Sequence, residues 1–348
     1  MKRKVFALRK AYPAVDAAKL VMALFVVGIH RSLFADRTLD HMTVNVLFSI
    51  AVPFFFVTSS FLLFRKLQSP EQDRRKTFLR FEKRILILYI VYTIVYLPCI
   101  FVKSFTGHYD EITLRALAGE CLFLVRRFFL DTSYIHMWYL HTLMISMLIV
   151  YLLTIKVHGR WLIAGVGATS LCGIIALEMA LPQIADMLTE AVRRTLMTGI
   201  PCVCAGYFAA QTDDETTRTE KIIYPILFVL FLGCGALTLD NKALWLKGIF
   251  KVLTFVSAFG VLRLCVGSTL QPHPAYAVMR KYSTLIYFLH LLLMNEGLNW
   301  LAAHTGIASL TEAGILSYSL TLFLAVIEAT CILLLQKKKG FHWLRVMY

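Results

Sequence analysis

The sequence predicts an all-α membrane protein, a polytopic bundle of about ten transmembrane helices with both termini in the cytoplasm. Three features lead to this fold class: an apolar composition, long blocks with few charges, and clusters of Lys and Arg between those blocks. The chain has 348 residues, of which 58% are hydrophobic, and its mean hydropathy is +0.68. Soluble domains are about 45–50% apolar, so a soluble core is strongly disfavoured.

The apolar blocks are about 17–25 residues long, which is the length that a helix needs to cross a bilayer. We expect them to form one membrane domain over residues 1–348, with a first helix that is retained rather than cleaved. The expected spans are 16–34, 44–64, 84–103, 136–156, 161–181, 195–210, 222–239, 244–266, 282–302 and 313–335. Segment 113–130 is apolar but interrupted by charges, which predicts an amphipathic helix at the membrane interface.

Basic residues set the expected orientation. The net charge is +15, and three Lys/Arg clusters lie at the N-terminus, in the loop after the second span and at the C-terminal end. An even number of spans places all three on one face, and short loops rich in Lys and Arg are cytoplasmic. This distribution fits a membrane protein better than a nucleic-acid-binding one, so no nucleic-acid partner is expected.

The eight cysteines do not indicate a metal site or a redox motif. No C-x-x-C pair is present, and the Cys202-x-Cys204 spacing is too isolated to bind a metal ion. We expect these residues to be small buried hydrophobes, and we expect no metal and no bound cofactor.

Ionisable side chains inside membrane spans are costly, so each indicates a functional site unless it has a structural partner. The first span carries Asp16, Lys19 and His30. Lys19 and His30 are eleven residues apart and share a helix face, and Asp16 is placed to pair with Lys19. The alternative is that the two charges only anchor the interface and that His30 lies in water at the outer end.

Two further histidines accompany spans. In the ninth span, Tyr287 and His290 are on one face, with the imidazole near the middle of the membrane. The fourth span opens with His136 and then Trp138, although aromatic residues are also common at any membrane boundary. A structural role for His290, satisfied by a neighbouring carbonyl, is the alternative. Four other ionisable residues near spans have roles that the sequence leaves open: Glu178, Arg263, Glu296 and Glu328.

Three segments together resemble the acyltransferase 3 family of membrane enzymes. The first is Asp16-Ala-Ala-Lys19 followed by His30, similar to a family pattern of Asp, Arg and a histidine eleven residues later. The second is the stretch 52–63, VPFFFVTSSFLL, followed by the basic run that begins at Arg80. The third is Ile-Tyr287-x-x-His290, and His136-Met-Trp-Tyr-Leu is similar to a further family signature.

The resemblance implies transfer of an acyl group, expected to be acetyl, from cytoplasmic acyl-CoA to a hydroxyl of an extracytoplasmic glycan or similar envelope acceptor. His30 would be the catalytic base, because an imidazole is the side chain best suited to deprotonate a hydroxyl. His290, Tyr287 or His136 would orient it or stabilise the oxyanion. The phosphates of the donor would be held by Lys19, Arg80 and Arg84, with Asp16 and Trp138 nearby.

This activity would take place in the plasma membrane, with the lipid bilayer, the acyl-CoA and the acceptor as partners. A transporter of a small solute such as an amino acid is the main alternative, since buried His, Lys and acidic groups also line transport paths. A non-catalytic subunit of an envelope complex is a third.

Overall fold

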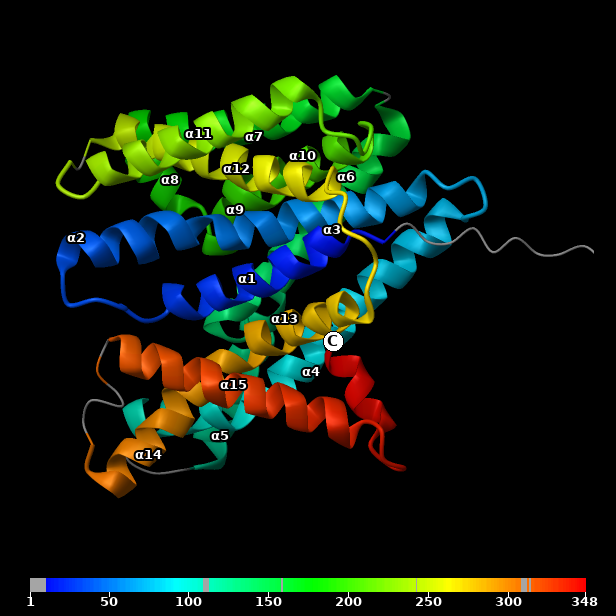
Figure 1. Cartoon of the computed structure of the whole chain (residues 1–348). Helices are drawn as coiled ribbons and strands as arrows, with labels where there is room; N and C mark the ends of the chain where they lie inside the picture. Colours follow the sequence, from blue (N-terminus) through cyan, green and yellow to red (C-terminus); the bar gives the residue numbers. More distant parts are fainter. Residues whose placement is uncertain (1–10, 109–112, 158, 242, 308–311, 313) are drawn as a thin grey trace, which may run out of the picture.

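The computed structural model describes residues 11–108, 113–157, 159–241, 243–307, 312 and 314–348, and within these ranges every regular element is helical. Side chains 102–108, 116, 295 and 296 are also outside the description. This confirms the all-α class. Figure 1 shows α1 and α3 in the middle of the bundle, with α7 and α10–α12 on one side and α4, α13 and α15 on the other.

The helices follow one another in this order: α1 (Pro13–Ile29), α2 (Arg37–Asp40), η1 (His41–Val46), η2 (Leu47–Ile50), α3 (Ala51–Leu67), α4 (Arg74–His108), α5 (Leu114–Leu130), η3 (Ile135–Met137), α6 (Trp138–Lys156), α7 (Arg160–Ala180), α8 (Pro182–Met187), α9 (Glu190–Arg194), η4 (Thr195–Gly199), α10 (Ile200–Ala210), α11 (Arg218–Leu237), α12 (Leu244–Val266), α13 (Pro274–Leu292), η5 (Leu293–Gly297), α14 (Leu298–Thr305), α15 (Ile315–Leu335) and η7 (His342–Met347).

Seven helical stretches of the described chain are long and apolar enough to cross a membrane. They are Arg37–Leu67, Arg74–Phe101, Leu117–Lys156, Arg160–Ala180, Arg218–Leu237, Leu244–Val266 and Ile315–Leu335. Each contains or overlaps one of the expected spans, so these seven positions agree with the sequence prediction.

The other three expected spans are helices that are short or interrupted. Span 16–34 corresponds to α1, which has 17 residues and ends at Ile29. Span 195–210 combines the π-helix η4 with the 11-residue α10. Span 282–302 falls on α13, the π-helix η5 and α14. Two of these three spans therefore contain a π-helical turn, a feature that often marks functional sites.

The segment expected at the interface, 113–130, forms the separate helix α5. Its large apolar side chains are mostly exposed, with Leu122 at 72% and Phe129 at 69%. The C-terminal end docks on the bundle, where the Tyr89 and Phe128 rings lie 4.6 Å apart. Residues 131–134 are not helical, and they separate α5 from η3 and α6.

The basic run expected in a loop after the second span is instead helical. Helix α4 begins at Arg74, so Arg80 and Arg84 stand on its first turns. Asp73 causes this early start, because its carboxylate accepts a 2.9 Å hydrogen bond from the Lys76 amide and so caps the helix. The same hydrogen bond holds the pKa of Asp73 below its usual value.

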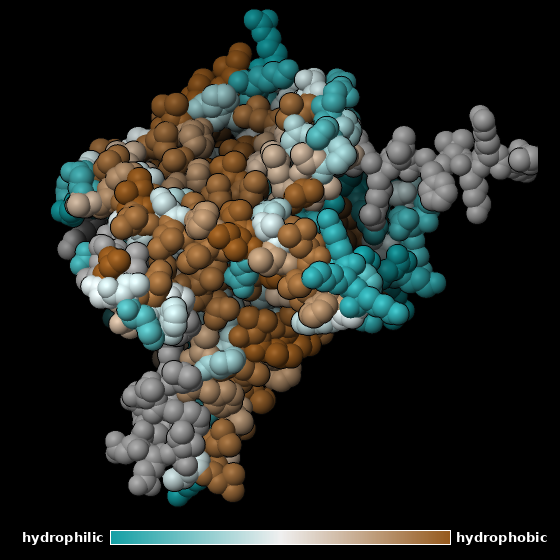
Figure 2. Space-filling model, turned by 60° about the horizontal axis from the view of Figure 1, so that its bottom comes forward, coloured by the Kyte–Doolittle hydropathy of each residue, from teal (hydrophilic) through white to brown (hydrophobic). Residues whose placement is uncertain are grey.

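The outer surface is that of a membrane protein. Figure 2 shows a broad face covered by apolar side chains, with polar side chains gathered at its margins. Exposed large hydrophobic residues occur on nearly every long helix, including α4, α7, α11 and α15. A soluble protein rarely exposes so much continuous apolar surface.

Helices α3 and α10 approach each other closely at Gly206. A Cβ added there would lie 2.4 Å from the Val57 carbonyl oxygen and 2.5 Å from the Ser60 Cβ. The close approach lets the Ser60 hydroxyl donate a 2.6 Å hydrogen bond to the Val203 carbonyl. Small residues allow this kind of contact between membrane helices.

Gly206→Ala is therefore expected to destabilise the protein, by about 1–3 kcal/mol as for other overpacked sites. Gly173→Ala is the matched control, because Gly173 is also inside a helix and has nothing within 4 Å of an added Cβ. Thermal unfolding in detergent should show a lower midpoint for Gly206→Ala alone. Equal midpoints for the two variants would contradict the close packing of α3 and α10.

Candidate functional site

Helices α1 and α13 lie side by side and run in the same direction. At one end, Arg280 Nη1 lies 3.2 Å from Asp16 Oδ2. At the other end, the rings of His30 and His290 are 5.3 Å apart. A helix rises about 1.5 Å per residue, so the ionic end and the imidazole end are about 15–21 Å apart.

Three imidazoles meet at the second end and form what we call the histidine cluster: His30, His136 and His290. The His136 ring lies 5.7 Å from the His290 ring. His136 and His290 are fully buried, at 1% and 0% exposure, whereas His30 caps the end of α1 and is half-buried. The structure thus brings together three histidines that the sequence placed on three different helical segments.

Hydrogen bonds to the backbone fix the tautomers of the two buried rings. His290 Nδ1 contacts the carbonyl oxygens of Tyr287 at 2.8 Å and Ile286 at 3.1 Å, and His136 Nε2 contacts that of Phe288 at 3.2 Å. A carbonyl only accepts, so these nitrogens carry the proton. In the neutral rings, His290 Nε2 and His136 Nδ1 are then acceptors, and both are buried without a described partner.

Aromatic side chains surround the cluster. The Tyr287 ring packs 5.5 Å from Phe55 and 5.4 Å from Tyr139, and its hydroxyl donates a 3.5 Å hydrogen bond to the His136 carbonyl. Phe55 belongs to the stretch 52–63, which lies on α3, and the hydroxyl of Ser59 in the same stretch lies 3.1 Å from the Tyr139 hydroxyl. This stretch therefore supplies part of the wall around the site, and Tyr287 links α13 to the turn that carries His136.

At the ionic end, the partner of Asp16 differs from the one that the sequence predicts. Asp16 bonds to Arg280, and no described hydrogen bond or ion pair joins it to Lys19. The guanidinium reaches the carboxylate from the neighbouring helix with a directional N–H group, which replaces the local pairing along α1. Lys19 interacts electrostatically with Asp16, Arg280 and Arg84. One carboxylate and three cations thus form an ionic cluster with excess positive charge: Asp16, Lys19, Arg84 and Arg280.

Two of the residues expected at the donor lie elsewhere. Arg80 is exposed on α4 and has no hydrogen bond or ion pair among the described residues. Trp138 is near the start of α6, where its ring lies 6.0 Å from Phe56 and the Arg194 guanidinium stacks 5.4 Å from its centroid. Neither has a described contact with the ionic cluster.

The structure gives partners to two of the four ionisable residues whose roles the sequence leaves open. Glu178 and Arg263 have structural partners: Glu178 binds Arg193 and Lys251, and Arg263, 3% exposed, binds Glu220 at 2.9 Å. In Glu328 on α15, Oε2 is buried without a described partner. Glu296 lies among the side chains outside the description.

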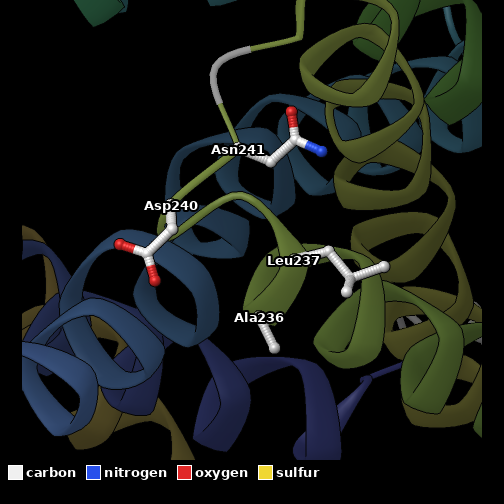
Figure 3. A pocket seen from close by; sticks show the side chains of 4 residues that line it. All are labelled: Ala236, Leu237, Asp240 and Asn241. Atoms are coloured by element: carbon white, nitrogen blue, oxygen red, sulfur yellow. The ribbon is translucent and has the colours of Figure 1, made fainter.

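A surface pocket lies apart from both clusters, at the end of α11 and in the turn that follows it. Figure 3 shows its lining by Ala236, Leu237, Asp240 and Asn241. None of these residues contacts the histidine cluster, and Asp240 forms an exposed 3.3 Å ion pair with Arg37. Within the described residues, no group of three or more His, Cys, Asp or Glu side chains has an arrangement that could hold a metal ion.

Sequence reasoning missed two residues of the site. Arg280 precedes His290 by ten residues, much as Lys19 precedes His30 by eleven, and this parallel was the available signal. Tyr96 on α4 lies 5.0 Å from the His136 ring. A tyrosine in an apolar helix is common, so nothing in the sequence distinguished it.

Comparison with known proteins identifies a family for the chain. Residues 12–334 match the acyltransferase domain of the acyltransferase 3 family. An amino-acid racemase of Enterococcus faecalis is 27% identical over 236 residues, which cover 64% of this chain and 31% of that protein. A serine/alanine racemase of Enterococcus gallinarum is 21% identical over 343 residues, 94% of this chain and 47% of that protein.

The chain thus spans about a third to a half of the curated relatives it matches. No solved structure matches it. Because the family match covers nearly the whole described bundle, including α1, α13 and the turn that carries His136, the chain belongs to the acyltransferase 3 family of membrane proteins.

Proposed function

We propose that the protein is a membrane O-acyltransferase that moves an acetyl group from cytoplasmic acetyl-CoA to a hydroxyl of an extracytoplasmic glycan or similar envelope acceptor. One observation carries the proposal: the parallel helices α1 and α13 hold the cationic ionic cluster at one end and the histidine cluster at the other. An extended pantetheine arm is of comparable length to the distance between them. Phosphates at the first end would therefore place the thioester near the imidazoles.

The ionic cluster suits the phosphates of the donor. Arg280, Lys19 and Arg84 outnumber the single carboxylate of Asp16, and Arg280 remains half exposed while it holds that carboxylate. Guanidinium groups bind phosphate oxygens with directional hydrogen bonds, and an ammonium adds a point charge. In this role Asp16 orients Arg280. Arg80, on an exposed face of the same helix as Arg84, would meet the donor only at its outer edge.

The histidine cluster suits the chemical step. His30, the most accessible of the three rings, takes the proton of the acceptor hydroxyl as its oxygen attacks the thioester carbonyl. The tetrahedral intermediate then breaks its C–S bond, and the CoA thiolate leaves and recovers the proton from His30. The product is an oxygen ester and free CoA.

The tautomers favour an orienting role for the other two histidines. In the neutral rings, His136 Nδ1 and His290 Nε2 each carry a lone pair and no proton. They can therefore accept a hydrogen bond from a hydroxyl of the acceptor substrate, but they cannot donate one to an oxyanion. Tyr287 supports them by holding the backbone of His136.

The proposed topology has ten spans in the plasma membrane, with both termini cytoplasmic and the histidine cluster on the outer half. It adds α1, η4–α10 and α13 to the seven long apolar stretches. The basic start of α4 supports the cytoplasmic assignment of that end of the bundle.

A second candidate is a transporter of an amino acid such as serine or alanine. It is favoured by the names of two relatives, an amino-acid racemase and a serine/alanine racemase, although these share only part of their length with this chain. Ionisable side chains buried within membrane helices also occur along transport paths.

Thermal shift of the purified protein separates the two functions. Acetyl-CoA is expected to raise the unfolding midpoint, since a ligand at 100 times its Kd stabilises by about 2.7 kcal/mol. Lys19→Ala should remove most of this shift. Stabilisation by serine or alanine with no response to acetyl-CoA would overturn the acyltransferase proposal and support transport.

A further inference from the structure

The Tyr96 hydroxyl on α4 is inserted beside the helical turn that carries His290. It donates a 2.8 Å hydrogen bond to the Phe288 carbonyl and accepts a 3.1 Å hydrogen bond from the Leu292 amide. These two backbone groups are four residues apart, which is the spacing of one α-helical hydrogen bond. The π-helix η5 begins at the next residue, Leu293, so Tyr96 stabilises the last α-helical turn before the geometry changes.

The same carbonyl also fixes His136. Phe288 O accepts from the Tyr96 hydroxyl and from His136 Nε2, and a carbonyl oxygen has two lone pairs. Both lone pairs therefore have side-chain donors. The Tyr96 ring contacts the His136 ring edge-on at 5.0 Å and stacks on Tyr134 at 4.3 Å, and Tyr96 is fully buried.

We propose that Tyr96 is a positioning residue that fixes the tautomers and orientation of His136 and His290 by holding the Phe288–Leu292 turn of α13. The catalytic consequence rests on the proposed acyltransferase function; the positioning itself does not. Without the hydroxyl, the Leu292 amide loses an acceptor and the Phe288 carbonyl loses one of two donors. The His136 ring and the backbone beside His290 then gain freedom to shift.

Tyr96→Phe removes the hydroxyl alone. Tyr92→Phe is the matched control, because Tyr92 lies one turn earlier on α4, is equally buried, and donates a 2.8 Å hydrogen bond to the Met347 carbonyl rather than to α13. Tyr92 also stacks on the Phe288 ring at 4.4 Å, so both variants keep an aromatic contact with the same region.

The first measurement is ¹⁵N NMR of the imidazoles in the full chain in detergent, with signals assigned from single histidine variants. Imidazole nitrogen shifts report which nitrogen carries the proton. Tyr96→Phe is expected to change the shifts of His136 and His290, and Tyr92→Phe is expected to leave them as in the wild type. Unchanged shifts in Tyr96→Phe, or equal changes in both variants, would overturn the proposal.

The second measurement is steady-state acetyl transfer. Tyr96→Phe should lower kcat about 10- to 100-fold with little change in the KM for acetyl-CoA, because misplaced catalytic groups affect the step rather than donor binding. A wild type without acetyl transfer would reject the proposed function, while the NMR result would still decide the role of Tyr96. An active wild type with an equally active Tyr96→Phe variant would reject the positioning role.

Discussion

Replacing His30 with alanine is expected to lower kcat for acetyl transfer by about 100- to 10,000-fold, the usual contribution of a general base. The ring lies 5.3 Å from His290, at the end of α1 where it is the most accessible member of the histidine cluster. No described residue forms a hydrogen bond with its side chain, so its loss should change the free energy of unfolding only slightly. Donor binding should be retained, because the ionic cluster is about 15–21 Å away.

His41→Gln provides the control for this prediction. His41 also lies beyond α1, but its Nε2 bonds to the Gly235 carbonyl at 3.0 Å, away from the cluster. Purified variants should be compared by initial rates and by the thermal shift with acetyl-CoA. Wild-type turnover in His30→Ala would remove the base assignment, and an equal loss in His41→Gln would mean that the effect is not specific to the cluster.

Arg280→Gln is expected to raise the KM for acetyl-CoA about 10- to 100-fold, with kcat changed much less. This corresponds to the loss of a charged hydrogen bond of about 1.5–3 kcal/mol. Arg280 is the guanidinium that α13 adds to Lys19 and Arg84, and it holds the only carboxylate of the ionic cluster, Asp16. Loss of binding without loss of the chemical step is the signature of a donor contact.

The donor itself supplies the sharper control. Acetyl-pantetheine lacks the nucleotide and its phosphates, so its KM should be the same in the wild type and in Arg280→Gln. Lys281→Gln removes the neighbouring positive charge, which lies over the Tyr348 ring at 4.9 Å and not in the ionic cluster. If Arg280→Gln raised the KM of both donors equally, Arg280 would act by stabilising the fold and not by binding the phosphates of the donor.

Much of the site follows from helical periodicity in the sequence. The 3.6-residue repeat places Lys19 and His30 on one face of α1, and it places Tyr287 and His290 together on α13. The sequence does not predict that these two helix faces contact each other. The contact between His30 and His290, and that between His136 and His290, join segments more than 150 residues apart, and they depend on how the helices pack.

The differences from expectation have local causes. Asp16 was expected to pair with Lys19 three residues away, but Arg280 approaches from α13 and takes that place. The run around Arg80 reads as a loop, yet the Asp73 cap starts α4 at Arg74. The span near His290 reads as one apolar block, whereas the structure interrupts it with a π-helical turn after Leu292. Hydropathy does not distinguish these geometries, because it reports how apolar a segment is and not which polar groups pair or which helical hydrogen-bond pattern the backbone adopts.

The central claim is that the histidine cluster transfers an acetyl group from CoA to an oxygen acceptor. The most direct test uses inside-out membrane vesicles from cells that express the wild type or His30→Ala, supplied with [¹⁴C]acetyl-CoA. Labelled envelope material is then collected and treated with mild alkali, which releases acetate from oxygen esters. We expect alkali-labile label in the wild-type vesicles and only background label with His30→Ala. Equal amounts of alkali-labile label in wild-type and His30→Ala vesicles would contradict the claim. So would wild-type vesicles with no more label than vesicles that lack the protein.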